Sequence, residues 1–417
     1  MKEELIKNRI RLSKMLENNS FAVIHSGYNK FKSADSVYDF FVNNNFYYLT
    51  NIDQANVILL VGNVNNHHFE KLFIESVDPE VAKWLGATLT HEEASELSGI
   101  AMQDILDINM FEKYTDSLYQ SNRYGLMEAH TVYLDLEYRD IPLYNTFGRV
   151  YAKTVRDRFP SVKIENCYNM IISLRMCKNE KEVALIKESI ATTKRAILNV
   201  MSHHNELSNE SIANAYHDFT IIKEGKTLSF NDIIASGHNA TVLHYDDNNS
   251  DILPNSLLLM DVGCYTKHYS SDITRTFPVN GKFTKRQKEV YEVVLDTNKK
   301  CIEYATAGMS WKELNDYANN LLAKGLIKLG LIKDISELRK YYFHSIGHSL
   351  GLDVHDPSHA SEGLKEGMVI TIEPGLYIPE ESIGIRIEDN IMITKEKAIL
   401  LSKDIIKEVE DIENFLK

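Results

Sequence analysis

Residues 257–278 read LLLMDVGCYTKHYSSDITRTFP and carry two aspartates, Asp261 and Asp272, within strand-like, apolar sequence. Carboxylates are among the residues least suited to a half-buried strand. A hairpin that turns at Thr266 and Lys267, or through a four-residue loop of the same register, pairs the two aspartates directly, with Cβ atoms about 5 Å apart. Because like charges at this distance destabilise a sheet, the stretch predicts either a cation between the aspartates or a solvated face.

A second stretch repeats this arrangement. Residues 368–394 read MVITIEPGLYIPEESIGIRIEDNIMIT, in which PEES is a natural turn. A hairpin centred between Glu380 and Glu381 pairs Glu373 directly with Glu388. Either pair alone fits the solvated face of an antiparallel sheet as readily as a metal site. The matching register in both hairpins favours the metal site.

Four carboxylates carry about four negative charges, which two divalent cations would balance. Hard oxygen ligands suit Mn²⁺, Mg²⁺ or Ca²⁺, and an added histidine favours Mn²⁺, Co²⁺, Fe²⁺ or Zn²⁺. Two metal ions about 3.5–4 Å apart can activate a bridging water and polarise a carbonyl group. Spacing alone leaves open which histidine joins them. The candidates in FHSIGHSLGLDVHD and SGHNATVLHYDDNN are His344, His348, His355, His238 and His244.

Composition places the chain among ordinary globular proteins. Its 417 residues, 44% hydrophobic and 25% charged, suffice for two or three domains. A net charge of −13 argues against binding to nucleic acid. The four cysteines form no CxxC motif, which fits reduced thiols. The first 20 residues contain no apolar h-region, and no run approaches the ~18 apolar residues that span a bilayer, so we expect no secretory signal and a cytoplasmic protein with no membrane or nucleic-acid partner.

The order of helix and strand signals suggests two domains. Helices and strands alternate up to about residue 160, which predicts an α/β domain over residues 1–165. Residues 174–417 contain two rounds of helices followed by strands, which predicts a pseudo-duplicated α+β domain with helices over a curved sheet. Capping boxes mark three helix starts in this second part, at Asn179 with Glu182, Thr284 with Gln287, and Ser310 with Glu313.

The two hairpin stretches and HSIGHSLGLDVHD together resemble the pita-bread metallopeptidases, in particular aminopeptidase P and its relative prolidase. The resemblance covers essentially the whole chain, because KSADSVYDFFVNNNFYYLTNIDQANVILL resembles the non-catalytic amino-terminal domain of aminopeptidase P. Methionine aminopeptidases lack that domain. The resemblance therefore implies a pita-bread catalytic domain over residues 174–417, preceded by the smaller α/β domain.

Matched residue by residue, the five metal ligands of the family fall on Asp261, Asp272, His348, Glu373 and Glu388. The resemblance thus selects His348 from the clustered histidines. It implies two divalent metal ions, by preference Mn²⁺, with a bridging hydroxide that attacks the substrate. Glu373 would also carry a proton from the attacking water to the leaving nitrogen.

The same resemblance implies further site residues. His244 and His355 match histidines that contact the substrate and steady the tetrahedral intermediate, and His344 matches a third. Arg386 matches an active-site arginine, although its place on a strand also suits a surface ion pair. Tyr377 matches a tyrosine near the site, where a structural role for its hydroxyl is the simpler reading.

The resemblance implies the activity of an Xaa-Pro aminopeptidase, which releases the first residue of peptides that have proline as the second residue. It also implies that the protein forms a homodimer or homotetramer. Trp84 matches a tryptophan that reaches a neighbouring subunit's site in some members, although a lone tryptophan is more often a packing residue. A prolidase, which cleaves only Xaa-Pro dipeptides, is the nearest alternative and needs a group to hold the free carboxylate. Creatinase-like hydrolysis without metal and a non-catalytic binding module are disfavoured, because all five ligands are present.

Overall fold

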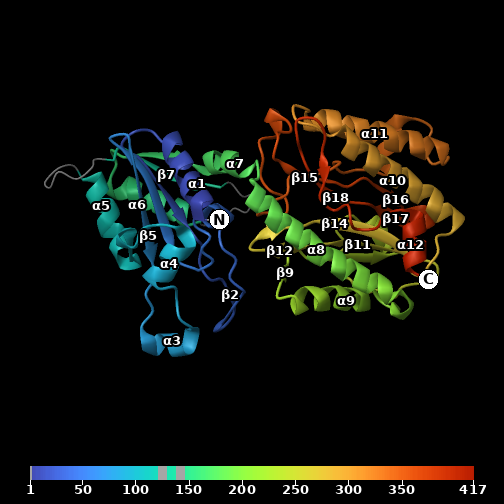
Figure 1. Ribbon diagram of the computed structural model, residues 1–417, viewed down its shortest axis with the longest axis horizontal. Coiled ribbons are helices and arrows are strands. Elements are labelled where there is room, and N and C mark those ends of the chain that lie inside the picture. The colour runs from blue at the N-terminus through green and yellow to red at the C-terminus, as the bar shows by residue number, and fades with distance from the viewer. Residues whose placement is uncertain (1, 121–128, 138–145) are drawn as a thin grey trace. The chain divides into compact units, whose positions relative to one another are not determined.

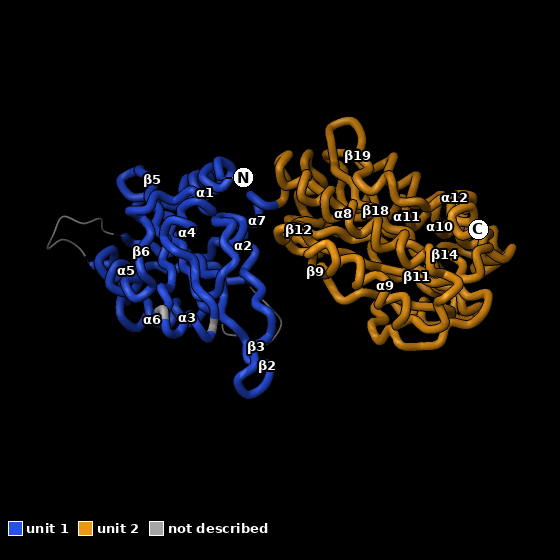
Figure 2. The backbone as a smooth tube through the Cα atoms, turned by 60° about the horizontal axis from the view of Figure 1, so that its bottom comes forward, with its two compact units in different colours: residues 1–175 blue, residues 176–417 orange. Residues whose placement is uncertain are grey.

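The computed structural model describes residues 2–120, 129–137 and 146–417. It contains two compact units, Met1–Arg175 and Met176–Lys417 (Figure 2). The sequence-based division left residues 166–173 between its two domains. In the structure the short helix α7 (Tyr168–Arg175) belongs to the first unit, because it packs on helices of that unit and buries Ile171 and Ile172. Within the described residues, no helix is both long and apolar enough to cross a membrane.

The first unit is built on a six-stranded mixed sheet. Its strands are β1 (Ser20–His25), β4 (Ile58–Val64), β5 (His67–Ile74), β6 (Ile105–Asp107), β7 (Thr131–Leu134) and β8 (Lys163–Asn166). Their order is β6-β5-β4-β1-β7-β8, with β1 antiparallel to β4 and parallel to β7. All residues of β1 are buried, as expected for a central strand covered on both faces. A separate exposed hairpin joins β2 (Phe31–Ser33) and β3 (Ser36–Val37).

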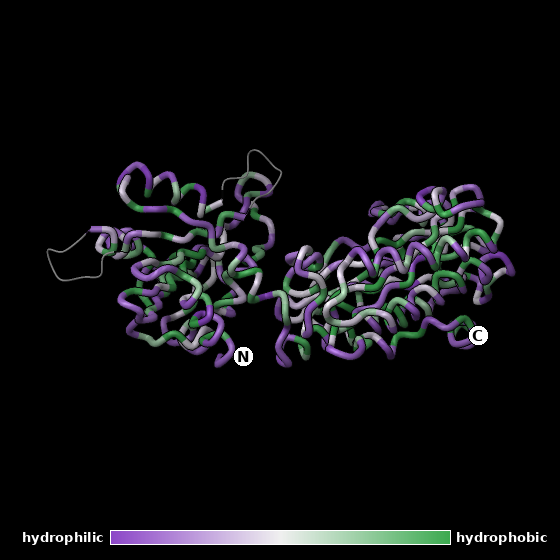
Figure 3. The backbone as a smooth tube through the Cα atoms, turned by 90° about the horizontal axis from the view of Figure 1, so that it is seen from above, coloured by the Kyte–Doolittle hydropathy of each residue, from purple (hydrophilic) through white to green (hydrophobic). Residues whose placement is uncertain are grey.

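Helices cover this sheet and complete its core. They are α1 (Lys2–Met15), α2 (Asn44–Thr50), α3 (Pro79–Leu85), α4 (His91–Ser98), α5 (Phe111–Tyr119), α6 (Phe147–Arg158) and α7. Phe21 and Val23 of β1 share one hydrophobic cluster with Phe111 of α5 and Tyr151 of α6. Hydrophobic residues gather inside each unit, whereas peripheral turns are more hydrophilic (Figure 3).

The second unit contains two helix pairs. Its helices are α8 (Glu180–Ser202), α9 (Glu210–Lys223), α10 (Lys285–Tyr304), α11 (Trp311–Lys328) and α12 (Val409–Phe415). Helix α8 packs on α9, and α10 packs on α11. The three predicted capping boxes, at Asn179, Thr284 and Ser310, are all present and begin α8, α10 and α11. These helix starts are therefore determined by local sequence.

The strands of the second unit follow each helix pair. After α9 come β9 (Thr227–Leu228), β10 (Ile233–Ser236), β11 (Leu257–Val262), β12 (Cys264–Thr266), β13 (Tyr269–Ser270) and β14 (Ile273–Pro278). After α11 come β15 (Val369–Ile372), β16 (Gly375–Ile378), β17 (Ile383–Arg386), β18 (Asp389–Met392) and β19 (Ile399–Leu400). The two sets meet where the amide of Glu388 donates to the carbonyl of Thr274 at 3.0 Å. Helices followed by strands therefore occur twice, which confirms the predicted pseudo-duplicated α+β architecture (Figure 1).

Of the two predicted hairpin registers, the structure confirms one and contradicts the other. The second is confirmed, because Gly375 pairs with Arg386 and Ile372 with Asp389, which sets Glu373 opposite Glu388. The first is wrong by one position on each strand.

In the first hairpin, Asp261 pairs with Thr274, and Asp272 is its diagonal neighbour. The turn lies at Lys267 and His268, whose φ angles of 48° and 64° are those of a two-residue type I′ turn. Lysine and histidine are unusual in such a turn, so the sequence did not reveal it.

Candidate active site

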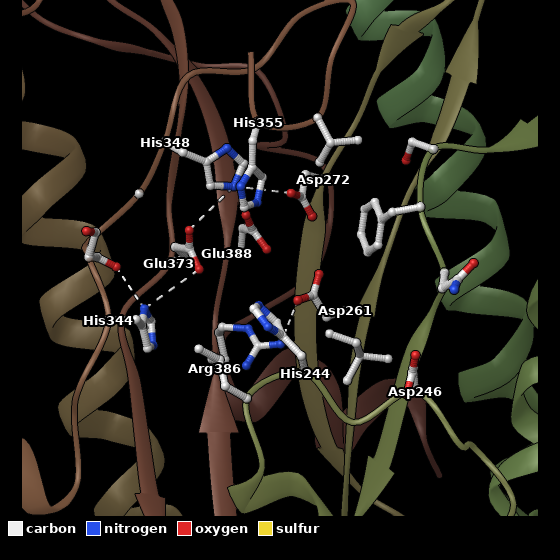
Figure 4. Close-up of a pocket in the computed structure, with 18 residues that line it drawn as sticks. His244, Asp246, Asp261, Asp272, His344, His348, His355, Glu373, Arg386 and Glu388 are labelled. Atoms are coloured by element: carbon white, nitrogen blue, oxygen red, sulfur yellow. Dashed lines mark hydrogen bonds and ion pairs between the residues drawn. The ribbon is translucent and has the colours of Figure 1, made fainter. Parts of the chain in front are cut away.

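The two carboxylate hairpins face one pocket in the second unit. Its volume is about 700 Å³, and both halves of the duplicated domain contribute to its lining. Asp261 and Asp272 come from the first hairpin, and Glu373 and Glu388 come from the second. Figure 4 shows these side chains directed toward a common centre, with His348 above them. The two aspartates are more than 100 positions from the two glutamates, so the predicted carboxylate cluster is assembled from distant parts of the chain.

Oxygen atoms of this cluster are close enough to share cations. One carboxylate oxygen each from Asp261, Asp272 and Glu388 lie within 4.8 Å of one another. Ligand atoms of His348, Glu373 and Glu388 meet the same limit. Glu388 belongs to both groups and therefore connects the two halves of the cluster.

Burial makes two of these carboxylates, Asp272 and Glu388, costly to ionise. It raises the pKa of Asp272 well above its ordinary value, and the neighbouring Asp261 and Glu373 raise it further. Burial also raises the pKa of Glu388 well above its ordinary value, and Asp272 adds to the effect. Such a group of acids requires positive charge nearby to be ionised at neutral pH.

The pocket residues fit divalent cations. Asp261 Oδ1, Asp272 Oδ1 and Glu388 Oε1 are buried and have no hydrogen-bond partner in the described part of the chain. Unpaired buried carboxylate oxygens are unfavourable unless a cation or a donor satisfies them. Four carboxylates and one imidazole form the hard, mixed oxygen and nitrogen donor set that divalent first-row metals accept.

His348 is oriented by its own backbone surroundings. Its Nδ1 lies 3.1 Å from the carbonyl of Ser349, a contact that directs Nε2 toward the carboxylates, as in metal-binding histidines. Nε2 lies 3.4 Å from Asp272 Oδ2 and 3.5 Å from Glu373 Oε1. Gly347 allows this approach, because a Cβ atom there would lie 2.0 Å from the carbonyl oxygen of Thr371.

Arg386 is part of the site, which rules out the surface ion pair. Its side chain is buried and donates from Nη2 to Asp261 Oδ2 at 2.6 Å. Nη1 donates to the Tyr377 hydroxyl at 3.0 Å, and that hydroxyl lies 2.8 Å from His344 Nε2. A continuous chain of contacts therefore joins His344 to Asp261 through Tyr377 and Arg386.

Neutral histidines surround the carboxylates. Burial, with Arg386 adding to it, lowers the pKa of His344 to about 4. Burial also lowers the pKa of His355 to about 4, helped by His348, whose ring centroid is 3.9 Å away. His244 is exposed at the pocket wall, and His238 is not among the described lining residues. Both His344 and His355 are therefore uncharged at neutral pH.

Several residues that support the carboxylates were not among the predicted site residues. Thr274 donates from Oγ1 to Glu388 Oε2 at 2.8 Å and accepts from Arg386 Nε at 3.1 Å. Asn390 donates to the Asp272 carbonyl at 2.7 Å. Thr274 lies two residues after Asp272, so strand alternation could have placed both side chains on one face.

Trp84 lies in the other unit. It occupies α3, its side chain is 88% exposed, and it does not line the pocket. This exposure argues against the packing role that a lone tryptophan usually has.

Comparison with known proteins agrees with this geometry. Residues 184–395 match the model of metallopeptidase family M24, and residues 5–126 match the aminopeptidase P amino-terminal domain. The chain therefore belongs to metallopeptidase family M24. These matches confirm the resemblance seen in the sequence, the predicted fold and the predicted enzyme class, a metallo-aminopeptidase.

Individual relatives carry the names of one kind of metallo-aminopeptidase. An Xaa-Pro aminopeptidase of Haemophilus influenzae is 31% identical over 436 residues, covering 100% of this chain and 97% of the relative. A Bacillus anthracis structure described as an aminopeptidase P is 44% identical, with a TM-score of 0.96 over 100% of this chain and 98% of that one. Escherichia coli aminopeptidase P in its low-pH form is 28% identical, with a TM-score of 0.90 and the same coverage.

Proposed function

We propose that this protein is a metal-dependent Xaa-Pro aminopeptidase, which releases the first residue from peptides with proline at the second position. The observation that carries the proposal is the cluster of four carboxylates and His348 in the pocket, with three buried oxygens that have no partner within the described residues. The relatives named Xaa-Pro aminopeptidase and aminopeptidase P support the substrate class.

The residues that would hold the metal are Asp261, Asp272, His348, Glu373 and Glu388. Two divalent ions would balance their four negative charges, and one imidazole among carboxylates favours Mn²⁺ over Mg²⁺ or Ca²⁺. Bound there, such ions would make a water molecule more acidic and polarise the substrate carbonyl.

Glu373 is the residue best placed to move the proton. Its Oε1 accepts a hydrogen bond from Thr371 Oγ1 at 3.3 Å, which leaves Oε2 to take a proton from the attacking water. Glu373 then delivers that proton to the proline nitrogen as the Xaa–Pro bond breaks. Water supplies the hydroxyl of the released carboxylate, so the reaction needs no other reactant.

The pocket histidines and Arg386 would bind and orient the substrate. His355 and His244 line the pocket and can donate hydrogen bonds to the carbonyl oxygen as it gains charge. His344 also lines the pocket, and its Nε2 lies 2.8 Å from the hydroxyl of Tyr377. Arg386 acts by holding Asp261 and Tyr377 in place.

Proline selectivity is supported by the pocket's apolar lining. Phe230, Ile233, Leu243 and Val354 offer a surface for the proline ring. Proline has no backbone N–H, so a site without an acceptor at that position loses nothing by binding it.

Longer peptides suit the pocket better than dipeptides. A dipeptidase needs a cation for the free carboxylate of its substrate, and Arg386 is the sole arginine or lysine among the described lining residues. All three of its side-chain nitrogens already bond Thr274, Tyr377 and Asp261. The prolidase alternative is therefore not favoured.

A homodimer or homotetramer is part of the proposal. Trp84, Phe31 and Tyr38 of the first unit are 88%, 77% and 55% exposed, which is unusual for large side chains and suits contact with a second copy. We assign Trp84 to the substrate site of that second copy. The four cysteines are all free thiols, which supports a cytoplasmic location.

The test is a rate assay on Ala-Pro and Ala-Pro-Ala, after chelation and after Mn²⁺ is restored. We expect metal-dependent cleavage of the tripeptide and little cleavage of the dipeptide. Cleavage of the dipeptide alone would favour a prolidase. No cleavage of either peptide, with metal bound, would contradict the proposed substrate class.

A further inference from the structure

His244 lines the pocket without a side-chain bond that fixes it. In the described part of the chain its imidazole makes no hydrogen bond or ion pair, and the residue is exposed. Burial is the main cause of the low pKa of both His344 and His355, and His244 lowers each pKa further, so its imidazole lies near both. The place of His244 in the pocket therefore depends on the backbone of residues 236–250, which we call the His244 loop.

Glu210 is a buried acid outside the pocket that binds the first part of this loop. It is the first residue of α9 and is 0% exposed. Its Oε1 accepts hydrogen bonds from the amide and the hydroxyl of Ser236, at 2.8 Å and 3.0 Å. The same oxygen accepts from Asn239 Nδ2 at 3.1 Å. Glu210 Oε1 thus holds the segment that precedes His244.

The second oxygen of Glu210 binds the part of the loop that follows His244. Glu210 Oε2 accepts from the hydroxyl of Tyr245 at 2.7 Å and from the amide of Ser250 at 3.0 Å. The amide of Glu210 also donates to the carbonyl of Ser250 at 2.9 Å. One carboxylate therefore joins the two ends of the His244 loop to the start of α9.

The cost of burying this carboxylate restricts the loop to one position. A buried carboxylate is unfavourable unless donors satisfy its oxygens. Among the described residues its five donors are all neutral groups, and all of them belong to the His244 loop. A shift of the loop would leave the acid buried without these partners, so the loop is held in the conformation observed.

Tyr245 carries this restraint to His244, because it is the next residue in the chain. Its hydroxyl binds Glu210, and its ring packs against one hydrophobic cluster of the second unit. The members of that cluster are Ile233, Ala235, Ala240 and Leu259. The side chain after His244 is therefore fixed both at its ring and at its hydroxyl.

The loop is also packed against the strand that carries Arg386. A Cβ atom at Gly384 of β17 would lie 1.9 Å from the carbonyl oxygen of Ala240, so glycine is needed for this close approach. Arg386, two residues further along β17, holds Asp261 of the carboxylate cluster. The position of the His244 loop is thus set relative to that cluster.

We propose that Glu210 is a positioning residue, which holds His244 where its imidazole can donate to the carbonyl oxygen of the substrate. This inference rests on the proposed Xaa-Pro aminopeptidase activity. Tyr245→Phe removes one bond of the restraint and keeps the packed ring, so we expect kcat to fall roughly three- to tenfold. Glu210→Gln turns an amide N–H group toward the donors of the loop, and we expect a loss of roughly 10- to 100-fold.

The experiment is a double-mutant cycle with His244→Ala, measured on Ala-Pro-Ala with the metal-loaded enzyme. Single-turnover assays at high enzyme concentration measure the slow variants. If Glu210 and Tyr245 act through His244, Tyr245→Phe should lower kcat in the wild-type background and leave it unchanged in the His244→Ala background. Tyr245→Phe also keeps the test available where Glu210→Gln does not fold.

Tyr269→Phe is the matched control. The Tyr269 hydroxyl donates at 2.8 Å to Glu182, a second buried acid in the first turn of a helix, and Tyr269 does not line the pocket. Tyr269→Phe should lower Tm by about as much as Tyr245→Phe but keep the wild-type kcat.

Three results would overturn the proposal. One is that the losses from Tyr245→Phe and His244→Ala multiply, because the two residues then act independently. Another is a fall in kcat for Tyr269→Phe equal to that for Tyr245→Phe, which would reflect general destabilisation. The third is a wild-type kcat in both Tyr245→Phe and Glu210→Gln. A wild-type enzyme that does not cleave Ala-Pro-Ala would contradict the proposed function itself, and this inference with it.

Discussion

Arg386 Nη2 lies 2.6 Å from Asp261 Oδ2, whereas Asp261 Oδ1 has no hydrogen-bond partner in the described chain. One oxygen of this aspartate is therefore held by the protein, and the other is left to face a cation. The contact joins strands from the two halves of the duplicated domain, β11 and β17.

Two substitutions of Arg386 should distinguish the effect of its positive charge from the effect of its three hydrogen bonds. Arg386→Lys keeps the positive charge but cannot bond Thr274, Tyr377 and Asp261 together, so we expect a loss of about 100-fold or more in kcat/KM. Arg386→Ala leaves Asp261 uncompensated and should lower the free energy of unfolding by about 3–5 kcal/mol. Arg286→Lys is the control, because its ion pair with Glu381 is partly exposed. A wild-type kcat/KM in Arg386→Lys would show that the activity does not need one side chain that bonds Thr274, Tyr377 and Asp261 together.

Removing one acid should relieve repulsion while abolishing activity. In metal-free protein, Asp272→Asn eliminates a buried carboxylate beside Asp261 and Glu373, so its Tm should equal or exceed that of metal-free wild type. Mn²⁺ at about 100 times Kd should stabilise wild type by about 2.7 kcal/mol and the variant by much less. Differential scanning calorimetry with and without metal measures both effects. An active, metal-binding Asp272→Asn enzyme would contradict the ligand assignment.

Thr274 should strengthen metal binding by orienting Glu388 and Arg386. Thr274→Val removes the donor to Glu388 Oε2 and the acceptor for Arg386 Nε. We expect metal affinity to fall about 10- to 100-fold, because such supporting contacts orient the ligands. Thr276→Val is the matched control, since Thr276 is equally buried but its hydroxyl bonds only the backbone of Arg386. Isothermal titration with Mn²⁺ distinguishes the variants, and equal affinities would contradict the supporting role.

A buried pair outside the pocket should make stability depend on pH. His217 in α9 lies 2.5 Å from Asp232 through its Nδ1. Burial lowers the pKa of His217, but hydrogen bonds to Asp218 and Asp232 outweigh burial and raise it to about 9. The folded protein thus binds this proton more tightly than the unfolded chain, whose histidine pKa is about 6.5.

The stabilisation from His217 is therefore complete below pH 6.5 and is lost as the pH rises toward 9. Its size is at most about 3 kcal/mol. Urea unfolding at pH 6 and pH 9 should show a smaller pH difference for His217→Gln than for wild type. His67→Gln, at an exposed position, should behave as wild type. The same pH difference in all three proteins would contradict the assignment.

Local patterns predicted much of the fold. Each of the three capping boxes begins a helix because its hydrogen bonds join residues only three apart. The position of the turn at Pro379–Glu381 and the alternation of side chains on both strands predicted the register in which Glu373 lies opposite Glu388. The first hairpin was predicted in the wrong register, because its turn uses Lys267 and His268, both at positive φ.

The sequence by itself determined that four carboxylates lie on two hairpins with histidines nearby, because side-chain alternation and turn position depend on near neighbours. Only the tertiary structure decided that Arg386 holds Asp261 and that Thr274 supports Glu388. The Asp261–Arg386 contact spans 125 positions and forms only when the two halves of the domain pack together. No local pattern encodes such a distance, so the chemistry of the cluster was predictable while the contacts that support it were not.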